Sequence, residues 1–398
     1  MTKKEKIKEV LERGVEEIIV KKHLEEELKI GKKLRIKFGI DPTSPDLHLG
    51  HSVPLRKLRQ FQKMGHKIVF LIGDFTAMVG DPSGRSEARK PLTKKEIRKN
   101  MEDYKKQAGK ILDMKKIEVR YNSEWYEKSP ASFLTDLSSR FTLARLMERD
   151  DFQKRIKKDI DITMLELTYP LLQGYDSVEL KASVELGGTD QKFNLLMGRK
   201  VQKRYGQSQQ DIMTVPLLLG LDGSRKMSKS FKNYIGLTEP AEDMYNKIMS
   251  IPDILIWHYF KLLTDFPLKE IEEMRNQVYS SKLNPKDAKA KLAKEIVTMY
   301  HSKKEAQKAE KEFNSVFKDK KAPQKMPVFV VVQKTYPPLD LLFTLNLASS
   351  KNEAKRIILQ GGFKINGKVE KNWKEEIKIE HGMIIQAGKR KFAKVNTH

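Results

Sequence analysis

The chain has 398 residues, a length that indicates two to four domains. Its 78 Lys and Arg residues against 53 Asp and Glu give a net charge of +25, which favours a polyanionic partner such as nucleic acid, although a merely solvated lysine-rich surface gives the same balance. The absence of cysteine excludes disulfides and thiol chemistry, and no apolar run suits a secretory signal or a membrane span, so we expect a cytoplasmic protein.

The first part of the chain alternates between helical and strand patterns. Residues 1–32 are predicted as an amphipathic helix, and residues 34–40 as a strand bounded by glycine. Apolar residues at helical spacing follow over 53–64, and 68–72 is a continuous apolar run typical of a buried parallel strand. Strand, helix and strand in this order predict an α/β fold with a doubly wound, Rossmann-like parallel sheet.

Composition and punctuation divide the rest of the chain. A second buried-strand pattern covers 212–219, Asn284-Pro285 marks a helix start, and a lysine-rich helix runs to about Phe317. We therefore predict a catalytic domain over 1–231 with a charged helical insertion at about 90–165, an α-helical domain over 232–320, a linker over 321–338 and a small α+β domain over 339–398.

The segment His48-Leu49-Gly50-His51 lies between a predicted strand and a predicted helix, where α/β sheets bind phosphates. Free N–H groups at the helix start carry partial positive charge, and Gly50 lets a flat ring approach the backbone. His48 and His51 share one face and can donate hydrogen bonds to phosphate oxygens. A metal site is disfavoured, because no other His or Cys clusters nearby. Taken alone, the motif is better explained by histidines that merely cap or pack.

The segment Lys226-Met227-Ser228-Lys229-Ser230 follows the second buried strand and a loop with two glycines. Its basic and hydroxyl side chains can fold over a triphosphate, and mobile lysines stabilise the extra charge on pentacoordinate phosphorus more than they stabilise ground-state ATP. The two motifs together predict a single site for adenylate formation.

Both motifs resemble the signatures of the class I aminoacyl-tRNA synthetases. Three further segments resemble the tyrosyl-tRNA synthetases, with the bacterial branch most similar: Gly80-Asp81-Pro82-Ser83-Gly84, Tyr169-Pro170-Leu171-Leu172-Gln173-Gly174-Tyr175-Asp176 and Gly187-Gly188-Thr189-Asp190-Gln191. The resemblance spans nearly the whole chain. It implies a ligase that converts L-tyrosine and ATP, with Mg²⁺, into tyrosyl-adenylate and pyrophosphate, and then transfers tyrosine to the 3′ adenosine of its tRNA.

An amino-acid pocket needs acceptors for an ammonium group, which Asp81, Tyr169 and Gln173 supply. A tyrosine pocket must also pair the phenol, because an unpaired polar group then rejects phenylalanine. Asp176 resembles that partner, and it shares a helix face with Tyr169 and Gln173 through spacings of three and four. The alternative reading of this face is ordinary polar helix surface.

The resemblance implies a complete set of site residues. Gln191 would hold the substrate carboxylate and Asp190 the ribose. We expect the catalytic groups to be His48, His51, Lys226 and Lys229; ATP to contact Gly39, Asp41, Thr43, His48, Gly50, His51, Gly188, Asp190, Lys226, Met227, Ser228, Lys229 and Ser230; and tyrosine to contact Lys37, Gly39, Asp81, Tyr169, Gln173, Asp176 and Gln191.

Lys37 departs from the family pattern. Many members have a tyrosine at this position, two residues before the glycine of the first strand, and it is hydrogen-bonded to the substrate phenol. Here phenol recognition must rest on Asp176, with Lys37 expected to hold that carboxylate ionised.

The tail from Leu339 to His398 resembles the S-four RNA-binding domain, named after a ribosomal protein. It has 12 Lys and Arg against 6 Asp and Glu, a charge of +6. Asn366-Gly367 predicts a type I′ hairpin turn. The residues expected to face RNA phosphates, rather than to form a solvated basic surface, are Lys351, Lys355, Arg356, Lys389, Arg390 and Lys391.

The insertion at about 90–165 resembles the dimer-forming segment of the family, which implies a homodimer, with one tRNA spanning both subunits. Three alternatives stay open. A non-catalytic RNA-binding paralogue would keep the fold without the chemistry. The tryptophan enzyme shares the fold, but Asp176 disfavours it because an indole has no hydroxyl. A small-molecule nucleotidyltransferase can carry a related histidine motif, but it would not need the basic tail.

Overall fold

The computed structural model describes residues 2–43, 46–83, 92–317, 326–332, 334–388 and 391–397. The chain forms two compact units, Met1–Tyr300 and His301–His398. Each unit has its own hydrophobic core and is described by itself. The finer division into four parts remains a prediction.

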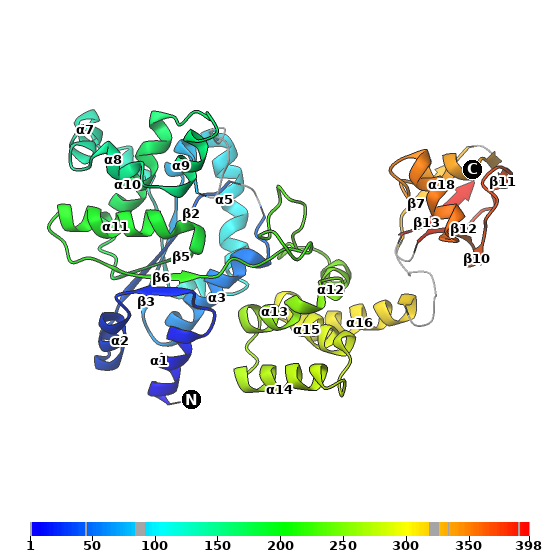
Figure 1. Ribbon diagram of the computed structural model, residues 1–398, viewed down its shortest axis with the longest axis horizontal. Helices are drawn as coiled ribbons and strands as arrows, with labels where there is room; N and C mark the ends of the chain where they lie inside the picture. Colours follow the sequence, from blue (N-terminus) through cyan, green and yellow to red (C-terminus); the bar gives the residue numbers. More distant parts are fainter. Residues whose placement is uncertain are drawn as a thin grey trace. The chain divides into compact units, whose positions relative to one another are not determined.

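The first unit is built on a six-stranded sheet with the order β1-β6-β5-β2-β3-β4 (Figure 1). All neighbouring pairs are parallel except β1 and β6, which are antiparallel. From β2 the chain builds one half of the sheet through β3 and β4 and the other through β5 and β6, so the predicted doubly wound α/β fold is confirmed. The strands are β1 (Glu17–Ile19), β2 (Arg35–Ile40), β3 (Lys67–Ile72), β4 (Ile117–Tyr121), β5 (Val184–Gly188) and β6 (Asp211–Val215).

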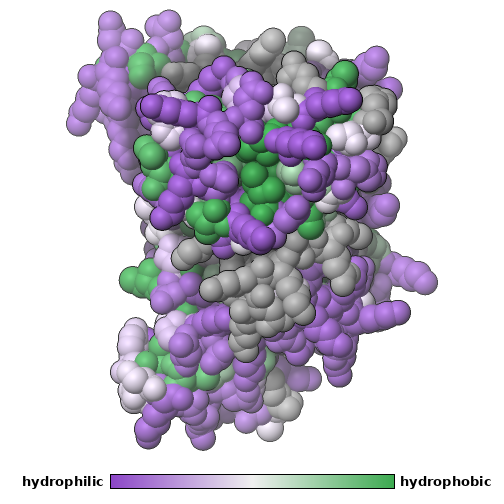
Figure 2. Space-filling model, turned by 90° about the vertical axis from the view of Figure 1, so that its right-hand side faces the viewer, coloured by the Kyte–Doolittle hydropathy of each residue, from purple (hydrophilic) through white to green (hydrophobic). Residues whose placement is uncertain are grey.

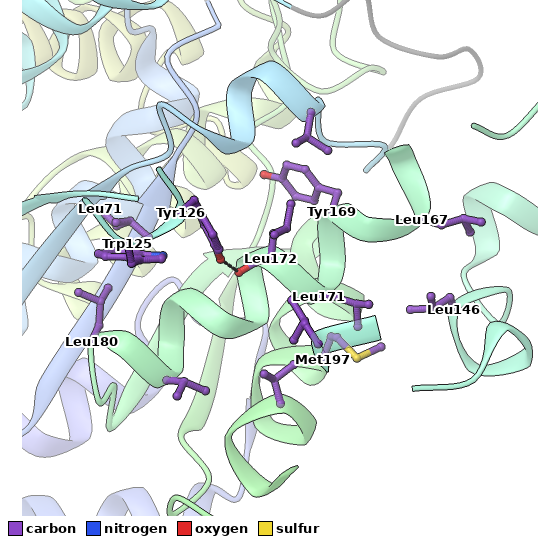
Figure 3. Packing of buried hydrophobic residues seen from close by; sticks show 14 of the residues in the cluster. Leu71, Trp125, Tyr126, Leu146, Leu167, Tyr169, Leu171, Leu172, Leu180 and Met197 are labelled. Atoms are coloured by element: carbon purple, nitrogen blue, oxygen red, sulfur yellow. Dashed lines mark hydrogen bonds between the residues drawn. The ribbon is translucent and has the colours of Figure 1, made fainter. Parts of the chain in front are cut away.

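Helices cover the sheet, because strands of a parallel sheet must bury both faces. Helix α3 (Leu49–Lys63) packs on β3 and β5, whereas α11 (Lys192–Arg204) packs on β5, β6 and α10 (Met164–Glu179). Side chains from β3, α10 and α11 form one buried cluster, in which the hydroxyl of Tyr126 donates to the carbonyl oxygen of Leu172 (Figure 3). This packing fixes α10, the helix predicted to carry the amino-acid pocket.

The prediction of one helix over 1–32 is wrong in its middle. Two helices, α1 (Lys3–Glu12) and α2 (Lys21–Ile30), flank strand β1, which pairs with β6. Gly14 breaks the helix in the left-handed region at φ +59°, and the β-branched residues Ile18 and Ile19 favour a strand.

The charged segment at about 90–165 contains a strand that the helical interpretation missed. Strand β4 pairs with β3 and forms an edge of the main sheet. The alternation of Ile117, Val119 and Tyr121 is the sequence signal for this strand that the prediction overlooked. The other elements here are α5 (Lys94–Ala108), η1 (Met114–Lys116), α6 (Ser123–Tyr126), α7 (Ala131–Ser139), α8 (Leu143–Leu146) and α9 (Asp150–Ile156). Two short helices, α4 (Thr76–Val79) and η2 (Thr189–Gln191), follow β3 and β5.

The first unit ends in a layer of helices after β6. Helix α15 begins at the predicted Asn284-Pro285 position and packs against α12 and α13, while α13 also contacts α3. The elements of this layer are α12 (Ala241–Met249), η3 (Asp253–Leu255), α13 (Ile256–Leu263), α14 (Leu268–Tyr279) and α15 (Pro285–Tyr300).

The second unit joins α16 (Lys303–Phe317) to a small α+β fold with a five-stranded sheet, order β10-β9-β12-β13-β7. Asn366 and Gly367 have φ values of 47° and 82°, which confirms the type I′ turn. Helices α17 and α18 contribute to its buried core. The elements are β7 (Val328–Val331), β8 (Thr335–Tyr336), α17 (Pro338–Thr344), α18 (Lys351–Leu359), β9 (Phe363–Ile365), β10 (Lys368–Val369), β11 (Ile377–Lys378), β12 (Met383–Ala387) and β13 (Lys391–Thr397).

On the face shown in Figure 2, most of the coloured surface is hydrophilic and apolar side chains lie in groups between the hydrophilic ones. None of the helices in the described parts of the chain has the length and apolar character needed to cross a membrane.

Candidate active site

A cleft of about 580 Å³ lies beside β2 and β5, the strands between which the chain order reverses. This is the crevice in which doubly wound sheets bind ligands. The cleft is lined by every residue predicted to contact ATP or tyrosine except Lys229. Residues that are up to about 190 positions apart in the sequence thus meet in one cavity, while their individual roles remain predictions.

The two signature motifs are joined through the backbone. The N–H of Leu49 donates to the carbonyl oxygen of Ile235, and the N–H of Leu237 donates to that of Leu47, both at 2.9 Å. His48 and Gly236 form the bridge between these bonds. The segment that follows Ser230 therefore holds the start of α3, so the two motifs are parts of one structural element.

His48 and His51 are neutral and have fixed tautomers. Burial, the neighbouring His51 and the loop lysines lower the pKa of His48 to about 2, and burial and Lys229 lower that of His51 to about 4. The N–H of Gly50 donates to Nδ1 of His48 at 3.1 Å, and the N–H of His48 donates to Nδ1 of His51 at 3.2 Å. Since each Nδ1 accepts, each proton is on Nε2, which is free to act as a donor.

Glycine is needed at position 50 for a steric reason. A Cβ atom there would lie 2.9 Å from the ring of His48, closer than real Cβ contacts allow. The motif therefore needs its glycine for the capping geometry of His48 as well as for any bound ring.

The lysines of the second motif reach across the cleft to carboxylates. Nζ of Lys226 lies 2.8 Å from Asp190, and Nζ of Lys229 lies 2.9 Å from Asp46. Lys229 thus stands next to the site without lining the cavity. Met227 is buried, and its N–H donates to the carbonyl oxygen of Leu218, which anchors the loop between the two lysines.

Two of the acceptors predicted to bind the ammonium group are held by other side chains. Asp81 accepts hydrogen bonds from Nε2 of Gln191 at 2.7 Å and from the hydroxyl of Ser83 at 2.6 Å. The hydroxyl of Tyr169 donates to Asp41 at 3.0 Å, which leaves its oxygen free to accept.

Gln173 supplies an unused acceptor. Its Oε1 atom is buried and has no hydrogen-bond partner among the described residues, although the side chain lines the cleft. A buried acceptor without a partner costs stability, so its presence at a cleft indicates a ligand donor.

Asp176, the predicted partner of the phenol, is almost fully buried. It accepts a hydrogen bond from Nε1 of Trp125 at 3.1 Å and a longer one from Asn122. Burial raises its pKa to about 7, against the opposing effects of Lys37 and of these hydrogen bonds. Lys37 lowers the pKa of Asp176, as expected, but burial raises this pKa by more.

The ammonium group of Lys37 binds Gln173, Ser177 and Glu185. Its Nζ donates to the carbonyl oxygen of Gln173 at 2.9 Å and to the hydroxyl of Ser177 at 2.8 Å, and it lies 2.9 Å from Oε1 of Glu185. These three acceptors use all three ammonium protons. Lys37 therefore supports α10 from below and has no donor left for a phenol.

Sequence reasoning missed several supporting residues. Glu185 is the most informative, since a lone acidic residue in the apolar strand Val184–Gly188 signals a buried partner. Asp46 and Asn122, which bind Lys229 and Asp176, carry no such signal because they lie in loops.

The predicted RNA-binding residues of the second unit gather at the start of α18. Lys351 and Arg356 are exposed on this helix, and Lys355 stacks on Trp373 at 4.2 Å. Nζ of Lys391 donates to the carbonyl oxygen of Leu347 at 3.0 Å, which ties β13 to the approach to α18. Lys389 and Arg390 lie outside the described residues.

Comparisons with known proteins agree with this geometry. Residues 29–318 match the family of tRNA synthetases class I (W and Y), and residues 339–381 match the S4 domain. The chain is 48% identical to the tyrosine–tRNA ligase of Thermotoga maritima, covering 100% of this chain and 98% of that protein. It is 47% identical to the tyrosine–tRNA ligase of Aquifex aeolicus, with 99% of each covered.

Among solved structures, the tyrosyl-tRNA synthetase of Archaeoglobus fulgidus in complex with L-tyrosine aligns with a TM-score of 0.63 at 26% identity, covering 78% of this chain and 100% of that one. The match confirms the fold of the catalytic part. From the family match and the full-length identity, the chain belongs to the class I tRNA synthetases of the tryptophan and tyrosine group, and within it to the tyrosyl-tRNA synthetases.

Proposed function

We propose that this tyrosine–tRNA ligase forms tyrosyl-adenylate in the cleft beside β2 and β5, with the residues assembled there. The observation that carries the proposal is the set of acceptors that line one cleft. Oε1 of Gln173, which is buried without a partner among the described residues, and the partly buried Asp81 would accept from an ammonium group, and the buried Asp176 would accept from a phenol hydroxyl. Such a pocket fits an amino acid that carries a hydroxyl on an aromatic side chain.

The first step needs no nucleophile from the protein. The ionised carboxylate of tyrosine attacks the α-phosphorus of ATP, a P–O bond forms, and pyrophosphate leaves as its own P–O bond breaks. The neutral histidines donate from Nε2 to the phosphate oxygens, and Lys226 and Lys229 supply positive charge. Because the charge on these oxygens increases in the transition state, these donors accelerate the step.

The loop lysines would exchange partners when ATP binds. Lys226 and Lys229 are paired with Asp190 and Asp46 in this structure, and phosphate oxygens compete with both carboxylates. Release of Lys226 would free Asp190 to bind the ribose hydroxyls, as its predicted role requires. Substrate binding and loop rearrangement are thereby coupled.

Mg²⁺ would enter with ATP. No cluster of three or more potential metal ligands is present in the described parts of the chain. Mg²⁺ is commonly held by substrate phosphates with one or two carboxylates, and the cleft offers Asp41 and Asp190 as single carboxylates. The ion would supply charge neutralisation to the phosphates.

In the second step a ribose hydroxyl of the terminal tRNA adenosine attacks the carbonyl carbon of the adenylate, and AMP leaves. We propose that the basic start of α18 and Lys391 contact the tRNA backbone, together with the α-helical region over 232–320 on the anticodon side. We propose that the reaction takes place in the cytoplasm, where both ATP and tRNA are present.

We also propose a homodimer formed through the segment at about 90–165 and the start of α10. Large apolar side chains are exposed there, including Leu143 at 60% and Met164 at 77%. Leu134, Ile156 and Leu165 are exposed in the same part of the chain. Single exposed apolar side chains are normal on a monomer, but five of them within one part of the chain favour an interface.

ATP–pyrophosphate exchange tests the proposal, with tyrosine, tryptophan and phenylalanine compared in parallel. Tyrosine alone should support exchange at physiological concentration. Exchange with tryptophan would assign the chain to the sister enzyme, and no exchange by folded protein with any of the three would refute adenylate formation. Charging of tRNA then tests the second step.

A further inference from the structure

A second cavity, of about 260 Å³, lies in the first unit apart from the cleft described above and shares none of its lining residues. It is formed where the end of α1, the later turns of α3 and the ends of α13 and α15 meet. Figure 1 shows α1, α3 and α13 as neighbours, and α3 contacts both of the others.

The charge of this cavity is strongly one-sided. Seven basic side chains line it, against one carboxylate, Asp265, among the described residues. Arg56 is paired with Asp265, while Arg59, Lys63 and Lys261 have no carboxylate partner in the described parts of the chain. Like charges this close repel one another, and a bound anion would relieve the repulsion.

The two most buried cations, Lys57 and Arg13, are held mainly by neutral acceptors. Nζ of Lys57 donates to the carbonyl oxygens of Val10 and Arg13 and to Oε1 of Gln60, all within 2.8 Å. The guanidinium of Arg13 donates to the carbonyl oxygens of Thr264 and Phe266, and it also pairs with Glu9. The carbonyl groups orient both side chains, and of the two only Arg13 also has a carboxylate partner. These two cations are thus held in place without a ligand.

The protonation of Lys57 would respond to an anion. Burial lowers the pKa of its ammonium to about 7; the charge of Glu9 opposes this effect and that of Arg13 adds to it. A negative ligand nearby stabilises the protonated form, so its binding should be accompanied by proton uptake near neutral pH.

We propose that this cavity is a second phosphate-binding site, for a ligand that presents two or more negative charges on phosphate groups. Two sources share this chemistry: a free oligophosphate, or phosphodiesters of the RNA substrate. Binding of RNA phosphodiesters here rests on the proposed function, whereas binding of a free oligophosphate does not.

The variant that tests the site is Arg59→Ala/Lys63→Ala. Both side chains lie on the last turns of α3, and Lys63 is exposed, so their removal leaves the buried bonds of Lys57 and Arg13 intact. A matched control, Lys22→Ala/Lys203→Ala, removes two exposed lysines of the same unit that line neither cavity. ATP–pyrophosphate exchange should be unchanged in both variants.

The first measurement is calorimetric titration of the full chain with inorganic tripolyphosphate, after the active site has been saturated with a non-hydrolysable tyrosyl-adenylate analogue. Wild type and control should bind one tripolyphosphate, with net proton uptake near pH 7, and the Arg59→Ala/Lys63→Ala variant should bind at least tenfold more weakly. Failure of the analogue itself to bind would count against the proposed function, and it is measured separately.

The second measurement distinguishes the sources. If the ligand is RNA, the variant should raise the KM for tRNA at least fivefold while the control stays within twofold, and tripolyphosphate should compete with tRNA. If the ligand is a free oligophosphate, the KM for tRNA should not change. Two results would overturn the proposal: no tripolyphosphate binding together with an unchanged KM for tRNA, or equal losses in variant and control.

Discussion

The ammonium of Lys37 lies 2.9 Å from a carboxylate oxygen of Glu185, and both side chains are almost fully excluded from solvent, at 0% and 1% exposure. The pair joins β2 to β5 directly beneath α10, because the same ammonium donates to Gln173 and Ser177. At a position where the family resemblance implies a tyrosine in many members, Lys37 supports the helix predicted to carry the tyrosine pocket.

Removing one member of this pair is predicted to destabilise the fold more than removing both. Lys37→Met would leave Glu185 charged and unpaired in the core, which costs about 3–5 kcal/mol in the free energy of unfolding. Lys37→Met/Glu185→Leu should lose much less, because no lone charge remains. Chemical denaturation measures both. Lys94→Met, which breaks the exposed pair with Glu127, should cost under about 1 kcal/mol and serves as the control. A double variant as unstable as the single one would contradict the explanation.

Asp176 is predicted to determine selectivity for the phenol. Asp176→Asn should lower kcat/KM for tyrosine by about a hundredfold or more while changing that for phenylalanine little, because the charged acceptor of the hydroxyl is lost. The ratio of the two exchange rates is the measurement. A parallel fall for both amino acids, with unchanged thermal stability, would show that Asp176 acts on catalysis rather than on recognition.

The raised pKa of Asp176, about 7, predicts a pH dependence. The folded chain holds this proton more tightly than the unfolded chain, so the contribution of this group to stability falls as pH rises from about 4 to 7. Activity should instead rise with pH, because the ionised carboxylate accepts the hydrogen bond of the phenol better. We expect kcat/KM for tyrosine to rise with an apparent pKa near 7. Asp176→Asn should flatten this profile, and an unchanged profile would assign the pKa to another group.

His48 is predicted to act as a neutral donor. Since its pKa lies at about 2, the rate of adenylate formation should show no histidine titration above pH 5. His48→Ala should reduce kcat by about 10²–10³-fold, the usual cost of one transition-state donor. His48→Asn keeps an acceptor for the N–H of Gly50 and so controls for the helix cap. If asparagine restored the rate as well as the stability, the cap rather than Nε2 would be the important contribution.

The exposed apolar surface makes a prediction about assembly. Leu143→Glu/Met164→Glu should shift the chain to a monomer in sedimentation analysis and reduce charging of tRNA. Ile254→Glu, which changes a side chain that is 79% exposed outside this segment, is the control and should leave assembly intact. A monomeric wild-type chain would rule out the homodimer.

The sequence alone determined the chemistry-bearing motifs, the doubly wound sheet and the order of strand and helix around the site, because periodicity and glycine placement are local properties. It did not reveal β1 or β4, because their short strand patterns lie among charged residues at helical spacing, and pairing with β6 and β3 decided between the two structures. Only the tertiary structure showed that Lys37 is saturated by Glu185, Gln173 and Ser177, that Asp176 holds its proton near neutral pH, and that the histidines are neutral. Charge state depends on burial and on distant neighbours, and neither can be read from spacing along the chain.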